Sequence, residues 1–157
     1  MEIRKATVFD IPALVALNQP VQTMHATAYP ETFRPNVPQE SVERAFDAMI
    51  QHPASYWLIA EADRPIGFLS SEFRDREASW CLAAQRICYL AGIAVDPDFR
   101  RRGVARGLIA ELQREVAARG ANRIELDVWT VNEDARQAFT RLGFRSVFER
   151  LSLGGIP

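Results

Sequence analysis

The segment at residues 91–107 constrains the fold more than any other part of the chain. An apolar, strand-like run at 91–95 ends at Asp96-Pro97, and an arginine cluster then leads into a helical pattern that opens at Gly103. This order predicts that the first unpaired amides of a helix lie in a positively charged turn. Such a turn favours an anionic phosphate group, and Gly103 would let a ligand approach the backbone closely.

The arginine-rich turn fits three alternative kinds of binding site less well. The G-x-G spacing of a dinucleotide-binding fingerprint is absent, and no Gly-Lys-Ser/Thr of a P-loop follows. Clustered arginines also suit nucleic acid, but the chain carries a formal net charge of −1 and its aromatic residues do not alternate with the arginines. We therefore expect a small phosphate-bearing ligand and no nucleic-acid partner.

Size and composition indicate a single domain spanning residues 1–157, with 48% hydrophobic residues. Cys81 and Cys88 form no C-x-x-C pair, and His25 and His52 are the only histidines, so we expect reduced thiols and no metal site. No apolar run reaches the roughly 18 residues that span a bilayer, and the N-terminal residues do not resemble a secretory signal. These features predict a cytoplasmic protein without a membrane partner.

Hydrophobic periodicity predicts a mixed α/β chain with the order β-α-α-β-β-β-α-β-α-β. The expected strands are 3–8, 56–62, 66–73, 87–95, 124–128 and 144–153. The expected helices are a first stretch in two pieces, 11–17 and 21–28, and then 41–50, 104–119 and 132–142. Pro20 would interrupt the first helical stretch, and residues 74–84 would form a loop. Gly92 indicates a bulge in the long apolar strand.

Two motifs resemble those of the GCN5-related N-acetyltransferases (GNAT). The pattern R-x-x-G-x-A at 100–105 is similar to the signature with which that family holds the pyrophosphate of acetyl-coenzyme A. The pattern N-x-x-A followed by L-G-F, at 132–144, resembles the family's C-terminal helix. The resemblance covers nearly the whole chain. It implies a bacterial acetyltransferase with a GNAT fold, in which a mixed central sheet is flanked by helices and two splayed strands admit acetyl-coenzyme A.

The same resemblance implies where the acyl donor binds. The backbone of Ile93, Ala94 and Val95 would pair with the pantetheine arm, and the Ile93 amide would stabilise the oxyanion of the reaction. The amides and side chains of the turn would hold the phosphates. The turn residues are Arg100, Arg101, Arg102, Gly103, Val104, Ala105 and Arg106. Asn132 either contacts the cofactor arm or only caps a helix. Phe139, seven residues later, is a further expected cofactor contact.

The catalytic groups implied by the resemblance are incomplete. Where the family usually has a tyrosine that protonates the leaving thiolate, this chain has Phe139, although solvent could supply that proton. Asp127 is the first candidate for the general base, because L-D-V at 126–128 resembles a segment of ribosomal-protein N-terminal alanine acetyltransferases. Glu125 would lie on the same strand face, and it is also a candidate contact for the acceptor. The alternative is that both carboxylates are merely solvated, and Tyr89 stands where histone-type members keep a glutamate.

We expect acceptor contacts in the N-terminal segment, where His25, Tyr29 and Phe33 cluster. His25 could act as a base or contact the acceptor, but a lone histidine in such a helix is more often a packed or capping residue. The expected reaction transfers an acetyl group from acetyl-coenzyme A to a primary amine of a small molecule or protein. The missing tyrosine leaves a second interpretation open, a coenzyme A-binding regulatory domain with little turnover. Homodimerisation through the expected strand at 145–153 is a further expectation from the resemblance.

Overall fold

The computed structural model describes residues 1–153, and the chain forms two compact units, Met1–Asp127 and a second that begins at Val128. The first unit contains a five-stranded sheet whose strands follow one another in chain order. They are β1 (Glu2–Lys5), β2 (Ser55–Glu61), β3 (Pro65–Arg76), β4 (Gln85–Val95) and β5 (Ile124–Glu125). The pairs from β1 to β4 are antiparallel, whereas β5 is parallel to β4.

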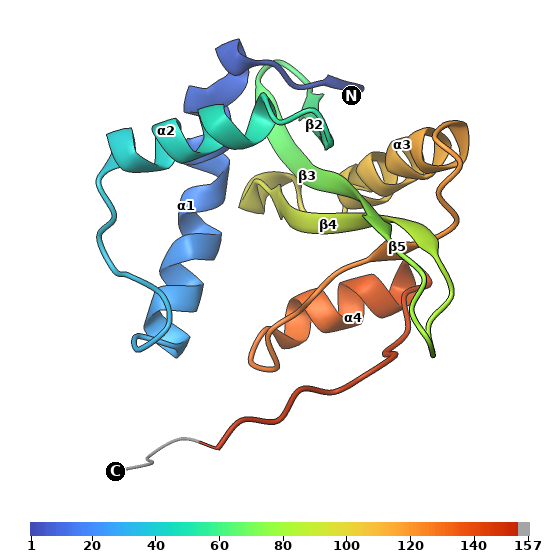
Figure 1. Ribbon diagram of the computed structural model, residues 1–157. Coiled ribbons are helices and arrows are strands. Elements are labelled where there is room, and N and C mark those ends of the chain that lie inside the picture. Colours follow the sequence, from blue (N-terminus) through green and yellow to red (C-terminus); the bar gives the residue numbers. More distant parts are fainter. Residues whose placement is uncertain (154–157) are drawn as a thin grey trace. The chain divides into compact units, whose positions relative to one another are not determined.

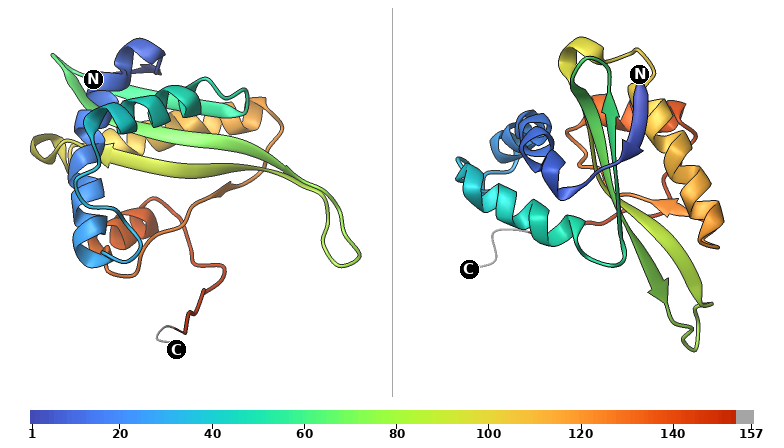
Figure 2. Two further views of the ribbon diagram at one scale, coloured as in Figure 1. Left: turned by 60° about the vertical axis from the view of Figure 1, so that its left-hand side comes forward. Right: turned by 90° about the horizontal axis from the view of Figure 1, so that it is seen from above.

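Helices cover both faces of this sheet. Helices α1 (Ile11–Ala28) and α2 (Gln39–Ile50) lie on one face, and α3 (Val104–Ala118) lies on the other (Figures 1 and 2). Because both faces are covered, the central residues of β2 and β3 are buried in uninterrupted runs. The α1/α2 side has a core cluster of Ala6, Leu14, Trp57, Ile59, Phe68 and Ala94. Helix α3 buries Val104, Leu108, Ile109, Leu112 and Val116.

Helix α1 differs from its prediction because it continues through Pro20 instead of breaking there. Proline removes one backbone hydrogen bond and usually kinks a helix. Here Leu17 and Val21, on either side of Pro20, both pack against the same core cluster. This shared packing holds the two halves in one helix.

The predicted bulge in β4 is confirmed. Ser70 and Ser71 of β3 pair with Gly92 and Leu90, so Ala91 is an extra residue without a partner opposite it. The β3–β4 pairing also continues beyond the end of β2, and the hairpin projects from the sheet (Figure 2, left). The predicted loop at 74–84 therefore begins only after Arg76.

The C-terminal third differs more from prediction. Strand β5 is only two residues long, and α4 (Glu133–Arg141) is the helix of the second unit. Residues 144–153 form no strand, since a strand needs a neighbour and the described part of the second unit contains none.

Two further observations concern expectations from composition. No helix in residues 1–153 is long and apolar enough to cross a membrane. Cys81 is exposed and Cys88 is buried, and both are free thiols. Burial raises the pKa of the Cys88 thiol, which makes it a poor nucleophile. The described residues contain no group of three His, Cys, Asp or Glu side chains that could hold a metal ion.

Candidate functional site

The turn between β4 and α3 has the geometry of an anion-binding site. Gly103 begins α3 with a φ of 85°, and no heavy atom lies within 4 Å of a Cβ placed on it. The first helical hydrogen bond joins the Gly107 amide to the Gly103 carbonyl at 2.9 Å. The amides of residues 104–106 therefore have no acceptor within the helix, and the first turn of α3 has no acidic residue to compete for them.

The arginines of this turn fall into two groups. Arg100 donates from Nε to the Val95 carbonyl at 3.3 Å, and the guanidinium of Arg102 lies 5.3 Å from the centre of the Phe99 ring. Arg101 and Arg106 have no hydrogen bond or ion pair with any residue in 1–153, and both are exposed. The second pair is thus available to an anionic ligand, whereas the first pair supports the turn itself.

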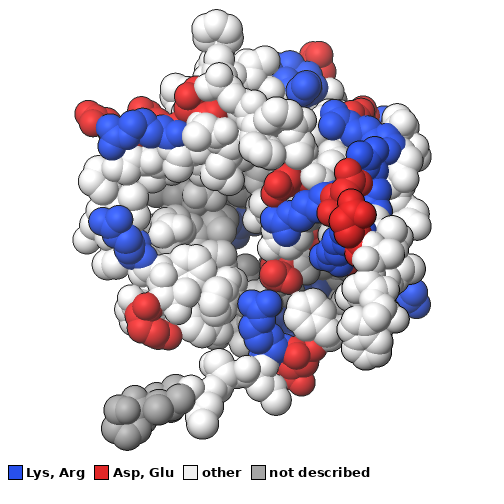
Figure 3. Space-filling model, in the orientation of Figure 1, with Lys and Arg blue, Asp and Glu red and all other residues white. Residues whose placement is uncertain are grey.

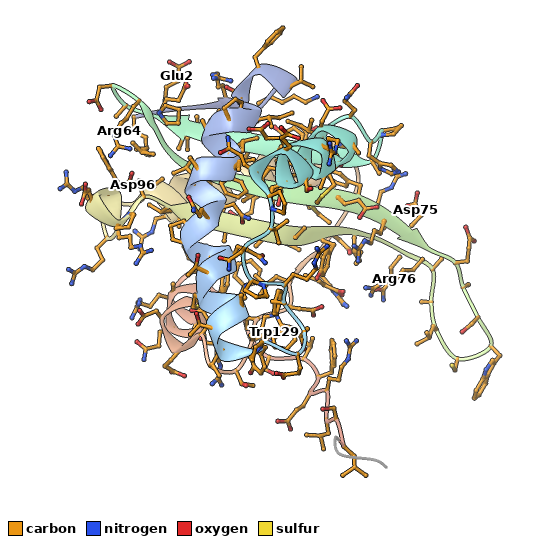
Figure 4. All side chains as sticks on the ribbon, turned by 90° about the vertical axis from the view of Figure 1, so that its left-hand side faces the viewer. Glu2, Arg64, Asp75, Arg76, Asp96 and Trp129 are labelled. Carbon is orange, nitrogen blue, oxygen red and sulfur yellow. The ribbon has the colours of Figure 1, made fainter. Side chains whose placement is uncertain are left out.

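Contacts with the β2–β3 hairpin hold the turn in place. Arg64 forms an ion pair of 2.7 Å with Asp96, and Figure 4 shows the two side chains at the same end of the sheet. The other oxygen of Asp96 accepts the Asp98 amide at 2.9 Å, and the hydrogen bond from Arg64 lowers the pKa of Asp96. Asp96 therefore remains ionised and fixes the chain just before the unpaired amides.

The C-terminal half of β4 has an open edge. Strand β5 pairs with β4 only at Cys88 and Tyr89, while β4 continues to Val95. The amide of Asp96 donates to the Ile66 carbonyl of β3, and amide directions alternate along a strand. The amides of Ile93 and Val95 therefore point away from β3, toward the edge of β4 that β5 does not cover. By the same alternation the amide of Ala94 faces β3, so Ala94 lacks the open-edge donor that Ile93 and Val95 present.

A row of polar side chains crosses the face of the sheet that carries α1 and α2. Glu72, Tyr89 and Glu125 are directly opposite one another on β3, β4 and β5, so their side chains share one face. Asp127 follows β5 and accepts a hydrogen bond on Oδ2 from the Tyr89 hydroxyl at 3.1 Å. Figure 3 shows acidic and basic side chains interleaved over the part of the surface where β3 and β4 project.

These carboxylates differ in their cationic partners. Glu125, a candidate acceptor contact, binds Arg76 at 2.8 Å and Arg123 at 3.4 Å, so both of its oxygens are engaged. Asp127 is exposed and has no arginine partner among the described residues, and its Oδ1 accepts no hydrogen bond. Asp127 can therefore accept a proton or a cation, whereas Glu125 is neutralised by its two arginines.

The other predicted residues lie at the end of α1 and in the second unit. The ring of His25 stacks on Phe33 with centroids 4.8 Å apart, the Tyr29 amide donates to the His25 carbonyl at 2.8 Å, and burial lowers the pKa of His25. This contact favours a packed role for His25. In the second unit, Asn132 caps α4 by accepting the Ala135 amide at 3.1 Å, and Phe139 packs edge-on against Phe144.

Sequence reasoning missed Glu72 and a cavity of about 290 Å³ between the end of α2 and the β4 bulge. The cavity is lined by Met49, by His52 of the next loop, by β3 residues as far as Glu72, and by Ala91. Ala91 is exposed although it lies within an eleven-residue strand. A bulge was predictable from Gly92, but the cavity depends on strand register and the position of α2.

The comparison with known proteins settles the family. The family model described as "Acetyltransferase (GNAT) family" matches residues 21–144. The chain belongs to the GNAT acetyltransferase family. The prediction of this family and of its fold from two short motifs is thus confirmed.

Three relatives illustrate the similarity of this GNAT protein. Aminoglycoside N(6')-acetyltransferase type 1 of Salmonella typhimurium is 36% identical over 93 residues, which are 59% of this chain and 63% of that protein. The crystal structure of the BH1408 tetramutant of Bacillus halodurans is 25% identical with a TM-score of 0.91, covering 98% of this chain and 99% of that one. AAC(6')-Iy, in complex with the bisubstrate analogue CoA-S-monomethyl-acetylneamine, is 25% identical with a TM-score of 0.72, covering 97% and 98%.

This chain therefore spans less than two thirds of the length of its curated Salmonella relative. Two of these three relatives are named as aminoglycoside acetyltransferases. They do not show the finer resemblance to ribosomal-protein N-terminal alanine acetyltransferases.

Proposed function

We propose that this protein is an acetyl-coenzyme A-dependent N-acetyltransferase that acetylates a primary amine of a small molecule, with Asp127 as general base. The observation that carries the proposal is the state of Asp127. Its carboxylate is oriented by Tyr89, keeps Oδ1 unpaired and has no arginine partner among the described residues. It lies two residues after the end of β5, the strand that pairs with β4, and the open edge of β4 would receive the acyl donor.

The hydrogen-bond donors and positive charges of this site fit acetyl-coenzyme A as the acyl donor. The pyrophosphate of coenzyme A is an anion, and the first turn of α3 offers unpaired amides together with the unpaired guanidinium groups of Arg101 and Arg106. The pantetheine arm carries amides, and the open edge of β4 offers backbone groups that can pair with them. Asn132 and Phe139 remain proposed donor contacts on the strength of the C-terminal motif alone.

The proposed chemistry uses few side chains. Asp127 accepts a proton from the acceptor ammonium at Oδ1, and the neutral amine attacks the thioester carbonyl carbon. The Ile93 amide donates to the developing oxyanion, an interaction that can lower the barrier by about 3 kcal/mol. The attacking nitrogen then releases its second proton to solvent, the carbon–sulfur bond breaks, and the thiolate takes a proton from solvent. The Tyr89 hydroxyl keeps the Asp127 carboxylate oriented throughout.

Three features support the remaining parts of the proposal. Relatives that act on or bind aminoglycoside compounds favour a small amine acceptor over a protein amino group. The family match runs through residues 127 and 128, which supports one catalytic domain over residues 1–157. Val147 and Phe148 are 75% and 64% exposed, which supports a homodimer formed through the C-terminal segment and measurable by light scattering.

A coenzyme A-binding regulatory domain is the second candidate. The observation that favours it is Phe139, which stands at the family's tyrosine position and packs against Phe144 at a centroid distance of 5.5 Å. A phenyl ring offers no proton to a leaving thiolate.

The test measures acetyl-coenzyme A binding by calorimetry and thiol release with neamine, spermidine, glucosamine and a peptide with an N-terminal alanine. Asp127→Asn should lower kcat/KM by about 100-fold, the usual contribution of a general base, and leave donor affinity unchanged. Asp75→Asn removes a carboxylate paired with Arg86 and serves as the charge-matched control. Binding without turnover of any acceptor would favour the regulatory candidate, and absence of donor binding would refute both.

A further inference from the structure

We propose that the acceptor carries a second ammonium group, which Glu72 binds at the mouth of the cavity between α2 and the β4 bulge. The acceptor class is then a compact diamine or polyamine, including amino sugars with several amines. This inference rests on the proposed function, because it assigns the part of the acceptor that does not react. Glu72 would be a specificity-determining residue.

The hydrogen bonds of Glu72 leave one oxygen for a ligand. Nε and Nη2 of Arg74 both donate to Oε2, at 3.2 and 3.1 Å, and Oε1 has no partner among the described residues. Arg74 also lies over the Tyr89 ring, 3.9 Å from its centre. An ammonium can therefore bind Oε1 while Arg74 keeps both of its contacts. The Glu72 and Arg74 side chains are 37% and 42% exposed, so solvent screens the attraction between them. Arg74 therefore competes only weakly with a second cation for Glu72.

Glu72 and Asp127 face the same space on opposite sides of Tyr89. Glu72 is directly opposite Tyr89 on β3, and the Tyr89 hydroxyl donates to Asp127 beyond β5. Because neighbouring strands lie about 4.8 Å apart, the backbones at Glu72 on β3 and Glu125 on β5 are separated by about 10 Å, and Asp127 lies two residues beyond Glu125. Each carboxylate has one oxygen held by the protein and one unpaired. This arrangement suits two ammonium groups of one molecule.

The cavity offers room for the skeleton that joins these groups. Its volume of about 290 Å³ approaches the lower end of the range for small-molecule sites. Trp57 and Ser70 form part of its wall, and both are buried, at 2% and 5% exposure. At the bulge, exposed Ala91 brings the cavity to within two residues of Ile93, the proposed oxyanion donor. The subsite therefore adjoins the open edge of β4.

The experiment compares acceptors that have several amines with acceptors that have one. Initial rates are measured with diaminohexane against hexylamine and with neamine against glucosamine, for the wild type and Glu72→Gln. The wild type should prefer the acceptor with more amines. Glu72→Gln should raise the KM for that acceptor about tenfold, as expected for loss of a charged hydrogen bond. The kcat of Glu72→Gln with that acceptor, and its kcat and KM with the monoamines, should stay within about twofold of the wild-type values, since the Asp127 base is intact.

Two variants control the result. Asp75→Asn removes one negative charge from the same strand on its opposite face, and it should leave the preference unchanged. Ala48→Leu adds side-chain volume at the cavity without changing charge, and it should weaken the preference as Glu72→Gln does. If Glu72→Gln keeps the wild-type preference, or if Asp75→Asn loses it equally, the inference is wrong.

Calorimetric titration of neamine into the coenzyme A complex separates this inference from the proposed function. Neamine binding that weakens about tenfold in Glu72→Gln, without acetylation by the wild type, would support the subsite and contradict the transferase. Acetylation of mono- and multi-amine acceptors with equal kcat/KM would support the transferase and contradict the subsite.

Discussion

Replacement of Gly103 by alanine tests whether the turn before α3 is built for a phosphate. Gly103 has a φ of 85°, a conformation that costs an L-residue about 1–2 kcal/mol relative to glycine. No atom lies within 4 Å of the added Cβ, so strain alone should lower the free energy of unfolding. For a chain of this length, a loss of about 1 kcal/mol corresponds to a fall in Tm of about 2–4 °C.

Gly120 provides a matched control at the other end of the same helix. Its φ is 69°, and an added Cβ would again have no atom within 4 Å. Gly120→Ala should therefore lose a similar free energy of unfolding. The two variants differ in one respect, because only Gly103 adjoins the unpaired amides of residues 104–106.

Thermal unfolding and calorimetric titration with coenzyme A distinguish strain from ligand exclusion. Both variants should show the same fall in Tm, but only Gly103→Ala should weaken coenzyme A binding, by about tenfold, because its methyl group crowds the approach to the helix N-terminus. Equal weakening in Gly120→Ala would show that the effect comes from destabilised α3. Unchanged affinity in Gly103→Ala would refute the phosphate site at this turn.

Three other predictions follow from particular contacts. Tyr89→Phe should lower kcat about tenfold without changing donor affinity, because it removes a hydrogen bond to the Asp127 carboxylate; unchanged turnover in rate assays would contradict that role. Phe139→Tyr should raise kcat if thiolate protonation limits the reaction, as measured by thiol release. The hydrogen bond from Arg4 lowers the pKa of Asp10 from 3.8 to about 2, so its stabilisation is present above pH 4 and is lost as the pH falls toward 2. Asp10→Asn should therefore lower the free energy of unfolding by about 1 kcal/mol at pH 7, after allowance for solvent screening of Arg4. In denaturation experiments, the difference in this free energy between the variant and the wild type should shrink as the pH falls toward 2.

Local sequence was enough to predict the turn and its helix. A positive-φ glycine, a run of arginines and a helical apolar period lie within about twenty residues, and each depends mainly on its immediate neighbours. The β2–β3 hairpin and the bulge near Gly92 were predictable for the same reason. The structure adds that Arg101 and Arg106 remain unpaired within the described residues, whereas Arg100 and Arg102 support the turn.

Predictions that depended on distant partners were less accurate. Pro20 indicated a break in α1, but packing of residues on both sides of it against one core keeps the helix continuous. Residues 144–153 have a strand-like pattern, yet a strand requires a neighbour that sequence periodicity does not supply. The cationic partners of Glu125 could not be predicted from sequence, because the arginines that bind it include Arg76 on β3.

The sequence by itself therefore determined the family, most of the order of elements and the anion-binding turn, since these rest on short-range spacing and backbone preference. Only the tertiary structure decided which carboxylates keep an unpaired oxygen. Strand register places Glu72 opposite Tyr89, and the Tyr89 hydroxyl reaches Asp127, although these residues are far apart in the chain. Register and helix packing also create the cavity beside Ala91. The chemistry proposed for the acceptor depends on these non-local contacts, because hydrogen bonds and charge pairing are set by distance in space.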